Sequence, residues 1–395
     1  MANKAYQIEF SGTALDEGFY GDIVSLTVEE NTATASTFHL QIALRLQNDG
    51  SWTYLDDDRL AVFNSAVVKV GFTDSESGSS DGLKTVFDGF ITDVDIEIGS
   101  DPENALFNIN GMDTSVMMSL EEKIATWPNM VDSDIVREIV ANYGITAQVD
   151  QTATVHQEDD TVIIQRGTDI QFVRDLAQKN GMEFFFETDD SGVLTAFFTV
   201  PQLDSTPQQD LAIQFGDQSN LRSFSAHLSG LRPLNVKAAQ MDVSSNSPNV
   251  AQTNDTQLAR LGDKDANALI GTHLDSQITP KDAQAQMLVL GPPTSNTTEM
   301  QTVVQAVRDE AGWFINAHGE INSDAYQSVL RPHRLVMVKG AGTTHSGKYY
   351  VTRVVHEINH AGDYIQRFEA RRNARDLDGS EQFGSDSSGL AISGI

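Results

Sequence analysis

Residues 342–370 read GTTHSGKYYVTRVVHEINHAGDYIQRFEA, and this stretch decides how the chain folds. β-Branched and aromatic residues fill positions 349–355, which is typical of a strand. Ala361-Gly-Asp363 then favours a turn, and positions 364–370 resume strand character. The stretch therefore predicts a β-hairpin.

The hairpin bears on a zinc-protease motif in the same stretch, His356-Glu-Ile-Asn-His360. That motif holds zinc when its two histidines lie one helical turn apart, with Cα atoms about 6 Å from each other. On a strand, four residues span about 13 Å, so two imidazoles cannot share one ion. Glu369 is the residue that could be proposed as a third ligand. We predict no metal site and no catalytic residue here.

A second motif, residues 342–348, nearly spells a phosphate-binding loop. Such a loop needs Ser or Thr after its Lys, and a helix that points backbone N–H groups at the phosphate. Tyr349 follows Lys348 instead, and the predicted strand continues from it. The glycines of this segment favour a tight turn between two strands, so we predict no nucleotide or other cofactor.

Composition narrows the classes of function. With 395 residues the chain is long enough for two to four domains. The absence of cysteine excludes disulfides and thiolate metal sites. We expect no membrane-inserted segment and no signal peptide, because no apolar run has the required length or position. The net charge of −30 argues against nucleic-acid binding.

The charge is unevenly distributed. Residues 331–375 hold nine Lys and Arg against three acids, a local charge of +6 that leaves −36 for the remainder. This segment predicts docking against an acidic surface, either the chain's own or a partner's, or a solvated strand face rich in arginine. Its cations are Arg331, Arg334, Lys339, Lys348, Arg353, Arg367, Arg371, Arg372 and Arg375.

Residues 5–112 predict an all-β unit. Short runs of alternating apolar and polar residues are separated by turns rich in Gly, Ser and Asp, which is typical of a small barrel or sandwich. The runs are 22–28, 37–44, 66–72, 86–98 and 105–110.

Residues 113–206 change character and predict an α/β region. Ser133 can cap a first helix, and the capping box Thr168-Asp-Ile-Gln171 opens a second one. Strands at 182–187 and 193–200 follow as a hairpin, and we interpret their phenylalanines as core.

The rest of the chain mixes strands with polar segments. Residues 207–243 return to strands, whereas residues 244–298 are rich in Asn, Ser, Thr and Asp and predict loops or a loose insert. Residues 299–317 predict one helix, and the tail from Asp376 is expected to be flexible. The apolar face of that helix comprises Val303, Val304, Val307, Ala311 and Phe314.

A weak internal repeat is visible. Residues 90–98 resemble residues 350–358, and each segment precedes a turn and a second strand. The alignment places His356 where Ile96 stands, which supports two similar barrels and weakens the zinc interpretation further. The second strands are 106–110 and 365–369.

Five segments carry a family resemblance when they are taken together. They are 134–144 (DIVREIVANYG), 169–186 (DIQFVRDLAQKNGMEFFF), 330–332 (LRP), 346–356 (SGKYYVTRVVH) and 362–372 (GDYIQRFEARR). The combination resembles the phage late-control protein D family of tail baseplate hubs, which includes the hub part of type VI secretion spike proteins. The resemblance covers most of residues 5–375.

The resemblance implies an α+β, mainly β fold of tail-hub architecture. It consists of two tube-like β-barrels joined by α/β insert domains and assembled as a trimer, whose six barrels match a sixfold tail tube. The expected domains are a first barrel at 1–112, an α/β connecting domain at 113–206, a second barrel at 207–243 and 331–375, an insert with a polar loop and a helix at 244–330, and a flexible tail at 376–395.

These expectations define one leading function. We expect a non-enzymatic hub of a contractile phage tail or phage-tail-like injection particle, a trimeric adaptor joining the sixfold tail tube to the threefold central spike. Fused family members continue into a spike, so the spike is expected to be a separate protein here. The other expected partners are the tail tube protein and baseplate proteins, with no nucleic acid. Assembly is expected in the bacterial or archaeal cytoplasm, and the product is a component of the virion or injection particle.

Two alternatives stay open. One is a zinc metalloprotease or cell-wall hydrolase of the tail tip, and the other is a receptor- or glycan-binding tail module. A hydrolase needs paired carboxylates, and the acidic runs Asp56-Asp-Asp58 and Asp159-Asp160 are better explained as solvated loops.

Overall fold

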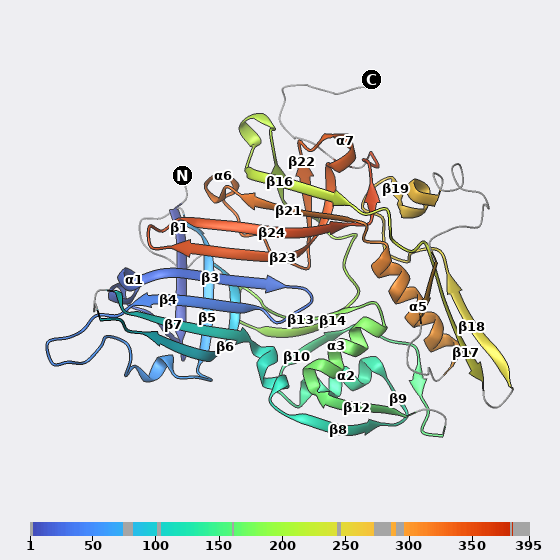
Figure 1. The fold of residues 1–395 in the computed structure, drawn as a ribbon, viewed down its shortest axis with the longest axis horizontal. Helices are drawn as coiled ribbons and strands as arrows, with labels where there is room; N and C mark the ends of the chain where they lie inside the picture. The colour runs from blue at the N-terminus through green and yellow to red at the C-terminus, as the bar shows by residue number, and fades with distance from the viewer. Residues whose placement is uncertain are drawn as a thin grey trace.

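A computed structural model describes residues 3–73, 82–100, 104–159, 162–242, 246–271, 286–289, 296–379 and 381. Its largest feature is a sheet of 13 strands, with smaller sheets and the longer helices beside it (Figure 1). Strands outweigh helices among the described residues. The predicted α+β, mainly β class is therefore confirmed.

The N-terminal strands build one half of the large sheet, in the order β3-β4-β7-β6-β5-β1-β2. Buried side chains alternate along these strands, so one face makes a core around Ile8, Leu40 and Ile109 and the other stays polar. Figure 1 shows β1 and β5 running across β3 and β4, which curls this half into a half-barrel. The elements are β1 (Asn3–Phe10), β2 (Thr13–Ala14), α1 (Glu17–Asp22), β3 (Ile23–Asn31), β4 (Thr37–Ala43), η1 (Asp58–Leu60), β5 (Ser65–Thr73), β6 (Lys84–Glu97) and β7 (Leu106–Asp113).

The second half of the large sheet runs in the order β16-β21-β24-β23, with β22 paired to β23 and β15 paired to β22. A second core lies on it, around Phe314, Tyr349 and Phe368. The hairpin predicted at its C-terminal end is confirmed as β23 and β24. The elements are β15 (Gln208–Ala212), η4 (Gly216–Gln218), β16 (Leu221–Leu228), β21 (Ile315–Ile321), α6 (Ser323–Tyr326), β22 (Leu335–Lys339), α7 (Gly342–His345), β23 (Gly347–Asn359) and β24 (Tyr364–Arg372).

The two halves join where β23 pairs antiparallel with β3, from Arg353 opposite Asn31 to Asn359 opposite Ser25. The end of the hairpin reaches over the first half, because Ile358 belongs to the N-terminal core. The last part of the second half therefore completes the core of the first.

The two halves repeat one pattern of five antiparallel strands, since β3-β4-β7-β6-β5 corresponds to β16-β21-β24-β23-β22. Two β-bulges fall at equivalent places. One is at Thr92 in β6 and Thr352 in β23, and the other at Val24 in β3 and Arg222 in β16. The repeat predicted from the sequence is confirmed, and the register is the one that aligns residues 90–98 with 350–358. The structural repeat ends at the fifth strand, because β1 is antiparallel to β5 whereas β15 is parallel to β22.

The connecting region packs two helices on a three-stranded sheet. Its capping box is confirmed, because Thr168 accepts from the backbone of Gln171. The cap predicted at Ser133 is wrong, since the helix begins after Val131 and the Ser133 hydroxyl accepts from the backbone N–H of Thr152. Phe184 is buried as predicted. The elements are η3 (Thr114–Ser119), β8 (Glu122–Trp127), β9 (Met130–Val131), α2 (Asp132–Ala141), β10 (Thr146–Val149), β11 (Val155–His156), β12 (Ile163–Thr168), α3 (Asp169–Lys179), β13 (Glu183–Thr188) and β14 (Leu194–Thr199).

The helix predicted at 299–317 is too long. Helix α5 (Thr297–Ala311) has its C-cap at Gly312, and β21 begins at Ile315. Buried and exposed residues alternate along β21, and its pairing with both β16 and β24 satisfies more backbone groups than another helical turn would.

A small sheet lies beside α5. It contains β17 (Asn235–Asp242), β18 (Ser247–Thr253) and β20 (Gln286–Val289). Strand β17 falls in the range assigned to the second barrel and β21 in the range assigned to the insert, yet β17 joins the small sheet and β21 the large one. Much of the predicted polar insert, including residues 272–285 and 290–295, lies outside the described residues.

Near the end of the described residues, a short strand ties the C-terminal part of the chain to the fold. Strand β25 (Ala374–Arg375) pairs with β19 (Lys264–Asp265), next to η5 (Asn267–Gly271). Residues 380 and 382–395 of the predicted flexible tail lie outside the described residues. None of the helices in the described part of the chain has both the length and the apolar character needed to cross a bilayer.

Candidate functional site

The two histidines of the zinc motif have different surroundings. His356 lies inside β23 and is buried, with Nδ1 2.7 Å from the Tyr364 hydroxyl and Nε2 3.0 Å from Glu30 Oε2. His360 follows the end of the strand, and its Nδ1 lies 3.1 Å from the backbone oxygen of Ile23. Both ring nitrogens of His356 are already engaged, and the strand context used in the prediction is confirmed.

The carboxylate beside His356 is buried at the junction of the two halves. Glu30 on β3 accepts from Arg331 at 2.9 Å as well as from His356. Burial opposes ionisation of Glu30, but the Arg331 charge and the bond to His356 outweigh it and hold the pKa of Glu30 below its ordinary 4.5. The contacts among Glu30, His356 and Arg331 therefore join β3, β23 and the segment before β22.

The remaining motif residues are also engaged locally. Glu369, the suggested third zinc ligand, pairs with Arg353 at 2.8 Å. In the phosphate-loop motif, the short helix α7 precedes Lys348 and Lys348 itself lies in β23, whereas phosphate binding requires a helix that begins at the Lys. Across the described residues, His, Asp and Glu side chains form no group of three suited to hold a metal ion.

The acidic runs lie in loops or at their ends. Asp57 pairs with Arg59 at 2.7 Å and caps η1. Of the second run, Asp159 belongs to a turn and Asp160 lies outside the described residues.

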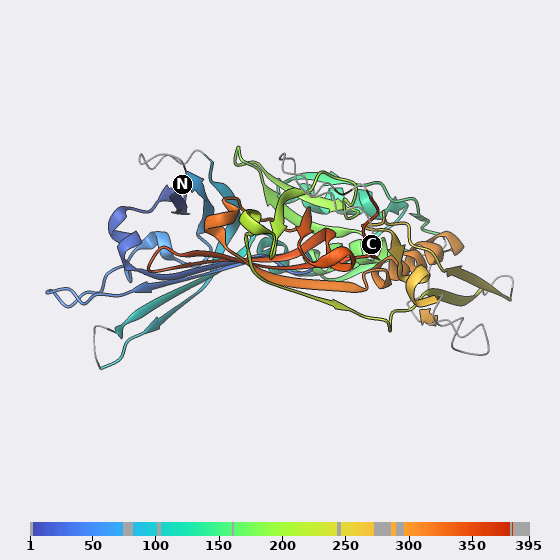
Figure 2. The ribbon, with the colours of Figure 1, turned by 90° about the horizontal axis from the view of Figure 1, so that it is seen from above.

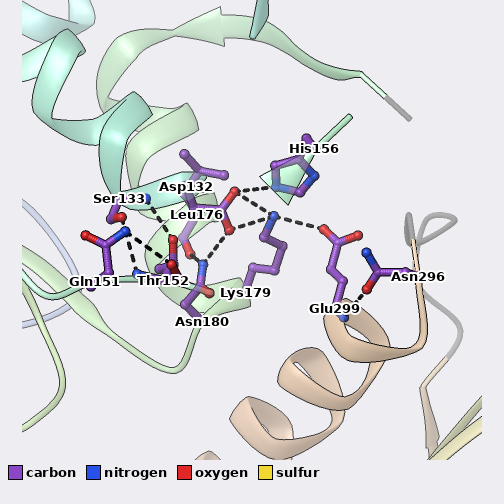
Figure 3. A network of polar contacts seen from close by, with 10 residues as sticks. All are labelled: Asp132, Ser133, Gln151, Thr152, His156, Leu176, Lys179, Asn180, Asn296 and Glu299. Carbon is purple, nitrogen blue, oxygen red and sulfur yellow. Dashed lines mark hydrogen bonds and ion pairs between the residues drawn. The ribbon is translucent and has the colours of Figure 1, made fainter. Parts of the chain in front are cut away.

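A buried polar cluster in the connecting region has the residue types of a hydrolase site (Figure 3). Asp132 accepts from His156 Nε2 at 2.9 Å, from Lys179 at 2.8 Å and from Asn180 at 2.7 Å. Burial opposes ionisation of Asp132, but the bonds from His156, Lys179 and Asn180 outweigh it, and the pKa of Asp132 is lowered.

The contacts within this cluster hold elements of the fold together. The neighbouring Ser133 hydroxyl accepts from the backbone N–H of Thr152 at 3.2 Å, whereas His156 is bonded to Asp132 (Figure 3). Lys179 also reaches Glu299 at the start of α5, at 3.0 Å. The cluster thereby ties α5 to α2 and α3 through buried charges.

Two grooves border α5, and one cation in the lining of each has acidic partners. A groove of about 600 Å³ is lined in part by Lys179, which pairs with Asp132 and Glu299. Another of about 700 Å³ is lined in part by Arg371, which pairs with Glu183 at 3.1 Å.

The basic segment meets acidic residues of its own chain, which was one of the predicted outcomes. Four of its ion pairs reach β3 or β13, and the other three lie within the second half or close to its end. They are Arg331–Glu30, Arg334–Glu187, Lys339–Asp210, Arg353–Glu29, Arg367–Glu320, Arg371–Glu183 and Arg375–Asp376.

Arg372 differs from the other cations because it is completely buried and bonds to backbone oxygens. Its guanidinium donates to Leu261 at 3.0 Å, to Ser346 at 2.8 Å and to Asp376 at 2.8 Å. Gly347, with φ of +129°, makes room for it, since a Cβ there would lie 2.6 Å from Arg372 Nη2.

The sheet edges are the surface that the sequence analysis did not identify. Strand β6 pairs with β5 only as far as Phe90, and no described strand pairs with that edge from Thr92 to Glu97. Val94, Ile96 and Ile98 are exposed there, at 37%, 53% and 48%. Figure 2 shows β6 and β7 projecting from the body as a ribbon.

Strand β16 forms another open edge, since β21 is its one partner among the described strands. The repeat contained the signal for the β6 edge, because it aligns exposed Ile96 with buried His356. Exposed strand edges invite pairing with another chain, so these two are the candidate assembly surface.

Comparisons with known proteins address the whole chain. Residues 2–360 match the family model described as the Alg8 N-terminal domain. No curated protein sequence matches the chain.

Solved structures share its fold. The 43 kDa tail protein of prophage MuSo2 from Shewanella oneidensis matches with a TM-score of 0.64 and 13% identity, over 95% of this chain and 100% of that one. The tail protein from Neisseria meningitidis MC58 matches at 0.62 and 10%, over 94% and 97%. An E. coli component of the type VI secretion system, described as similar to T4 bacteriophage tail proteins, matches at 0.53 and 13%, over 92% and 76%. The fold is therefore that of phage tail proteins.

Proposed function

The chain belongs to the Alg8 N-terminal domain family, and on this premise, together with its tail-protein fold, we propose that it is a structural hub of a contractile phage tail or a phage-tail-like injection particle. In this role three copies form an adaptor between the sixfold tail tube and the threefold central spike. Baseplate proteins surround it, and it assembles in the bacterial or archaeal cytoplasm before it becomes part of the particle.

The internal repeat is the observation that carries the proposal. Each copy holds two units of the same five strands, with bulges at equivalent positions. Three copies then present six similar units around one axis, which fits a threefold protein on one side and a sixfold tube on the other.

The polar face of the sheet supports the same role. Opposite the two cores, side chains pair across neighbouring strands, as with His39 and Asn110 at 2.8 Å and Arg353 and Glu29 at 2.7 Å. A continuous polar sheet face suits a water-filled passage that continues a tube.

We also propose that the protein is not an enzyme. The support is that the residues of both enzyme-like groups have internal partners: His356 is held by Tyr364 and Glu30, and Asp132 by His156 and Lys179. These groups serve the fold.

The test is reconstitution with the tube and spike proteins of the same particle. Sedimentation of the hub with both partners is expected to give a complex that contains three hub copies. A hub that stays monomeric and unbound with both partners present would remove the proposal.

A further inference from the structure

We propose that β6 of one copy pairs with β16 of a second copy, in the register in which β23 pairs with β3 inside the chain. This inference rests on the proposed hub function in one respect, which is the closure of the assembly at three copies. The pairing itself rests on the internal repeat.

The two open edges are the counterparts of a joined pair. Strand β23 corresponds to β6, and its far edge is covered first by β22 and then by β3. The same edge of β6 is covered first by β5, and from Thr92 onward by no described strand. Strand β16 corresponds to β3, and its outer edge is likewise unpaired among the described strands.

Equivalent side chains are buried in β23 and exposed in β6, as expected if a further strand covers β6 in the assembly. Val354, His356 and Ile358 of β23 are 0%, 1% and 4% exposed. Their equivalents are Val94 and Ile96 of β6 and Ile98 just after it, and all three are exposed. Solvent-facing apolar side chains in a row on an open strand indicate a surface that another protein covers.

The receiving strand shows the same difference. Leu26 and Val28 of β3 are each 1% exposed beneath β23. Their equivalents on β16, Phe224 and Ala226, are only partly buried against the second core. A second copy's β6 would extend that core in the way that β23 extends the first one.

The repeat fixes the register residue by residue. Since His356 stands opposite Val28 and Ile358 opposite Leu26, the equivalent pairs place Ile96 opposite Ala226 and Ile98 opposite Phe224. In the same register Val94 stands opposite Leu228. All of these side chains then lie on the core face, because alternate residues of paired strands share a face.

The hydrogen-bonding groups at the junction are also complementary. Inside the chain, Arg353 pairs with Glu29 at 2.7 Å. The equivalents are Asp93 on β6 and His227 on β16, so the acid and the base exchange places. Asp95 stands directly opposite His227 in this register, and either acid can accept from the imidazole N–H.

A second copy is the occupant that these observations favour. The two edges match each other in register, apolar content and hydrogen-bonding groups, and every copy carries one of each. Contacts of this head-to-tail kind repeat from copy to copy, and they close into a ring when the rotation between copies divides a full turn, as the hub function supplies at three copies.

Disulfide trapping tests the pairing directly, because the chain has no cysteine of its own. In the full-length protein, Ile96→Cys combined with Ala226→Cys is expected to form intermolecular disulfides on mild oxidation. Within one copy the two positions lie seven strand steps apart along the sheet, on the order of 30 Å, whereas a disulfide needs Cα atoms within about 7 Å. A crosslink therefore reports contact between copies.

The matched control shifts one cysteine by one residue. Ile96→Cys with Ser225→Cys places the two thiols on opposite faces of the paired strands, so it is expected to crosslink far less. Equal crosslinking by both double variants, or none by the first at concentrations where the protein self-associates, would overturn the proposed register.

A charge substitution provides an independent readout. Ile96→Glu is expected to abolish self-association with an unchanged melting temperature, because the side chain is exposed in one copy. Ile124→Glu, at an 85% exposed residue on β8, is the control that should leave association intact. Normal association of Ile96→Glu would contradict the pairing.

The two proposals fail in different ways. Hub complexes that form with tube and spike but never trap the 96–226 disulfide would reject the strand pairing and keep the hub. A trapped ring that binds neither tube nor spike would keep the pairing and reject the hub.

Discussion

At the scale of single residues, Arg372 shows how a cation of the basic segment serves the interior. Its three nitrogens donate to three backbone oxygens from different parts of the chain, and none of its surface reaches solvent. Buried carbonyls that lose a charged donor are costly, because no water replaces it.

Replacing this residue is therefore expected to destabilise the protein. Arg372→Ala should lower the free energy of unfolding by about 3 kcal/mol or more, from three lost bonds and a cavity. Arg367→Ala, on the same strand with a 46% exposed side chain, should cost less than about 1 kcal/mol. Urea denaturation compares the two variants, and equal losses would contradict the assigned role.

Glu30 makes stability depend on pH. The pKa of this carboxyl is lowered in the folded state, because Arg331 and His356 outweigh the effect of burial. A lowered folded-state pKa stabilises the protein above the unfolded value of about 4.5, and the contribution is lost as pH falls below it.

Unfolding free energies between pH 6 and pH 3 should reveal this contribution. Glu30→Gln is expected to be less stable than the parent at neutral pH and to lose less stability on acidification. Glu29→Gln, which changes the partly exposed neighbour on the same strand, should alter the slope less because solvent screens it. An unchanged slope in Glu30→Gln would show that other carboxyls account for the acid sensitivity.

The zinc motif yields a third expectation at this scale. Purified protein should contain no stoichiometric zinc, because His356 lies within a strand and both of its ring nitrogens have partners. Elemental analysis measures the metal content. One equivalent that disappears in His356→Ala would refute the structural assignment.

At the scale of elements, the end of the described chain is held by β25 and Asp376. The Asp376 backbone oxygen accepts from Arg372 at 2.8 Å, and its carboxylate pairs with Lys264 at 2.9 Å. The position at which the chain is cut should therefore matter.

Two truncations test this. Removal of the residues after Glu381 is expected to change the melting temperature little. Removal of the residues after Arg375 should lower it clearly, since it takes away an acceptor of a buried guanidinium, worth about 1.5–3 kcal/mol. Equal melting temperatures would show that Asp376 adds nothing to the fold.

At the scale of the whole molecule, net charge opposes assembly. Each copy carries −30, so copies that approach one another repel at low salt. The proposed contacts between copies are mainly apolar and backbone contacts, which salt does not weaken.

Raising the salt concentration should therefore favour the trimer. Near 1 M salt the screening length falls to about 3 Å, which removes most of the repulsion between copies. Sedimentation velocity across a salt series should show a growing trimer fraction, and Ile96→Glu should stay monomeric throughout. Trimers that dissociate as salt increases would mean that charge attraction holds the copies together.

Local patterns in the sequence determined a large part of this protein. The β23–β24 hairpin follows from β-branched residues on both sides of Ala361-Gly-Asp363, and the start of α3 follows from its capping box. The repeat was visible because equivalent strands have similar side-chain patterns. The physical reason is that turns, caps and strand periodicity depend on residues only a few positions apart.

Contacts between distant segments decided the rest. The end of α5 depends on β21 finding two partner strands, and Ser133 is used by Thr152 rather than by its own helix. The pairing of β23 with β3 leaves β6 and β16 open, although the same pattern occurs in both halves. The sequence pattern is the same at a covered edge and at an open one, because the difference depends on which strand the rest of the chain brings beside it.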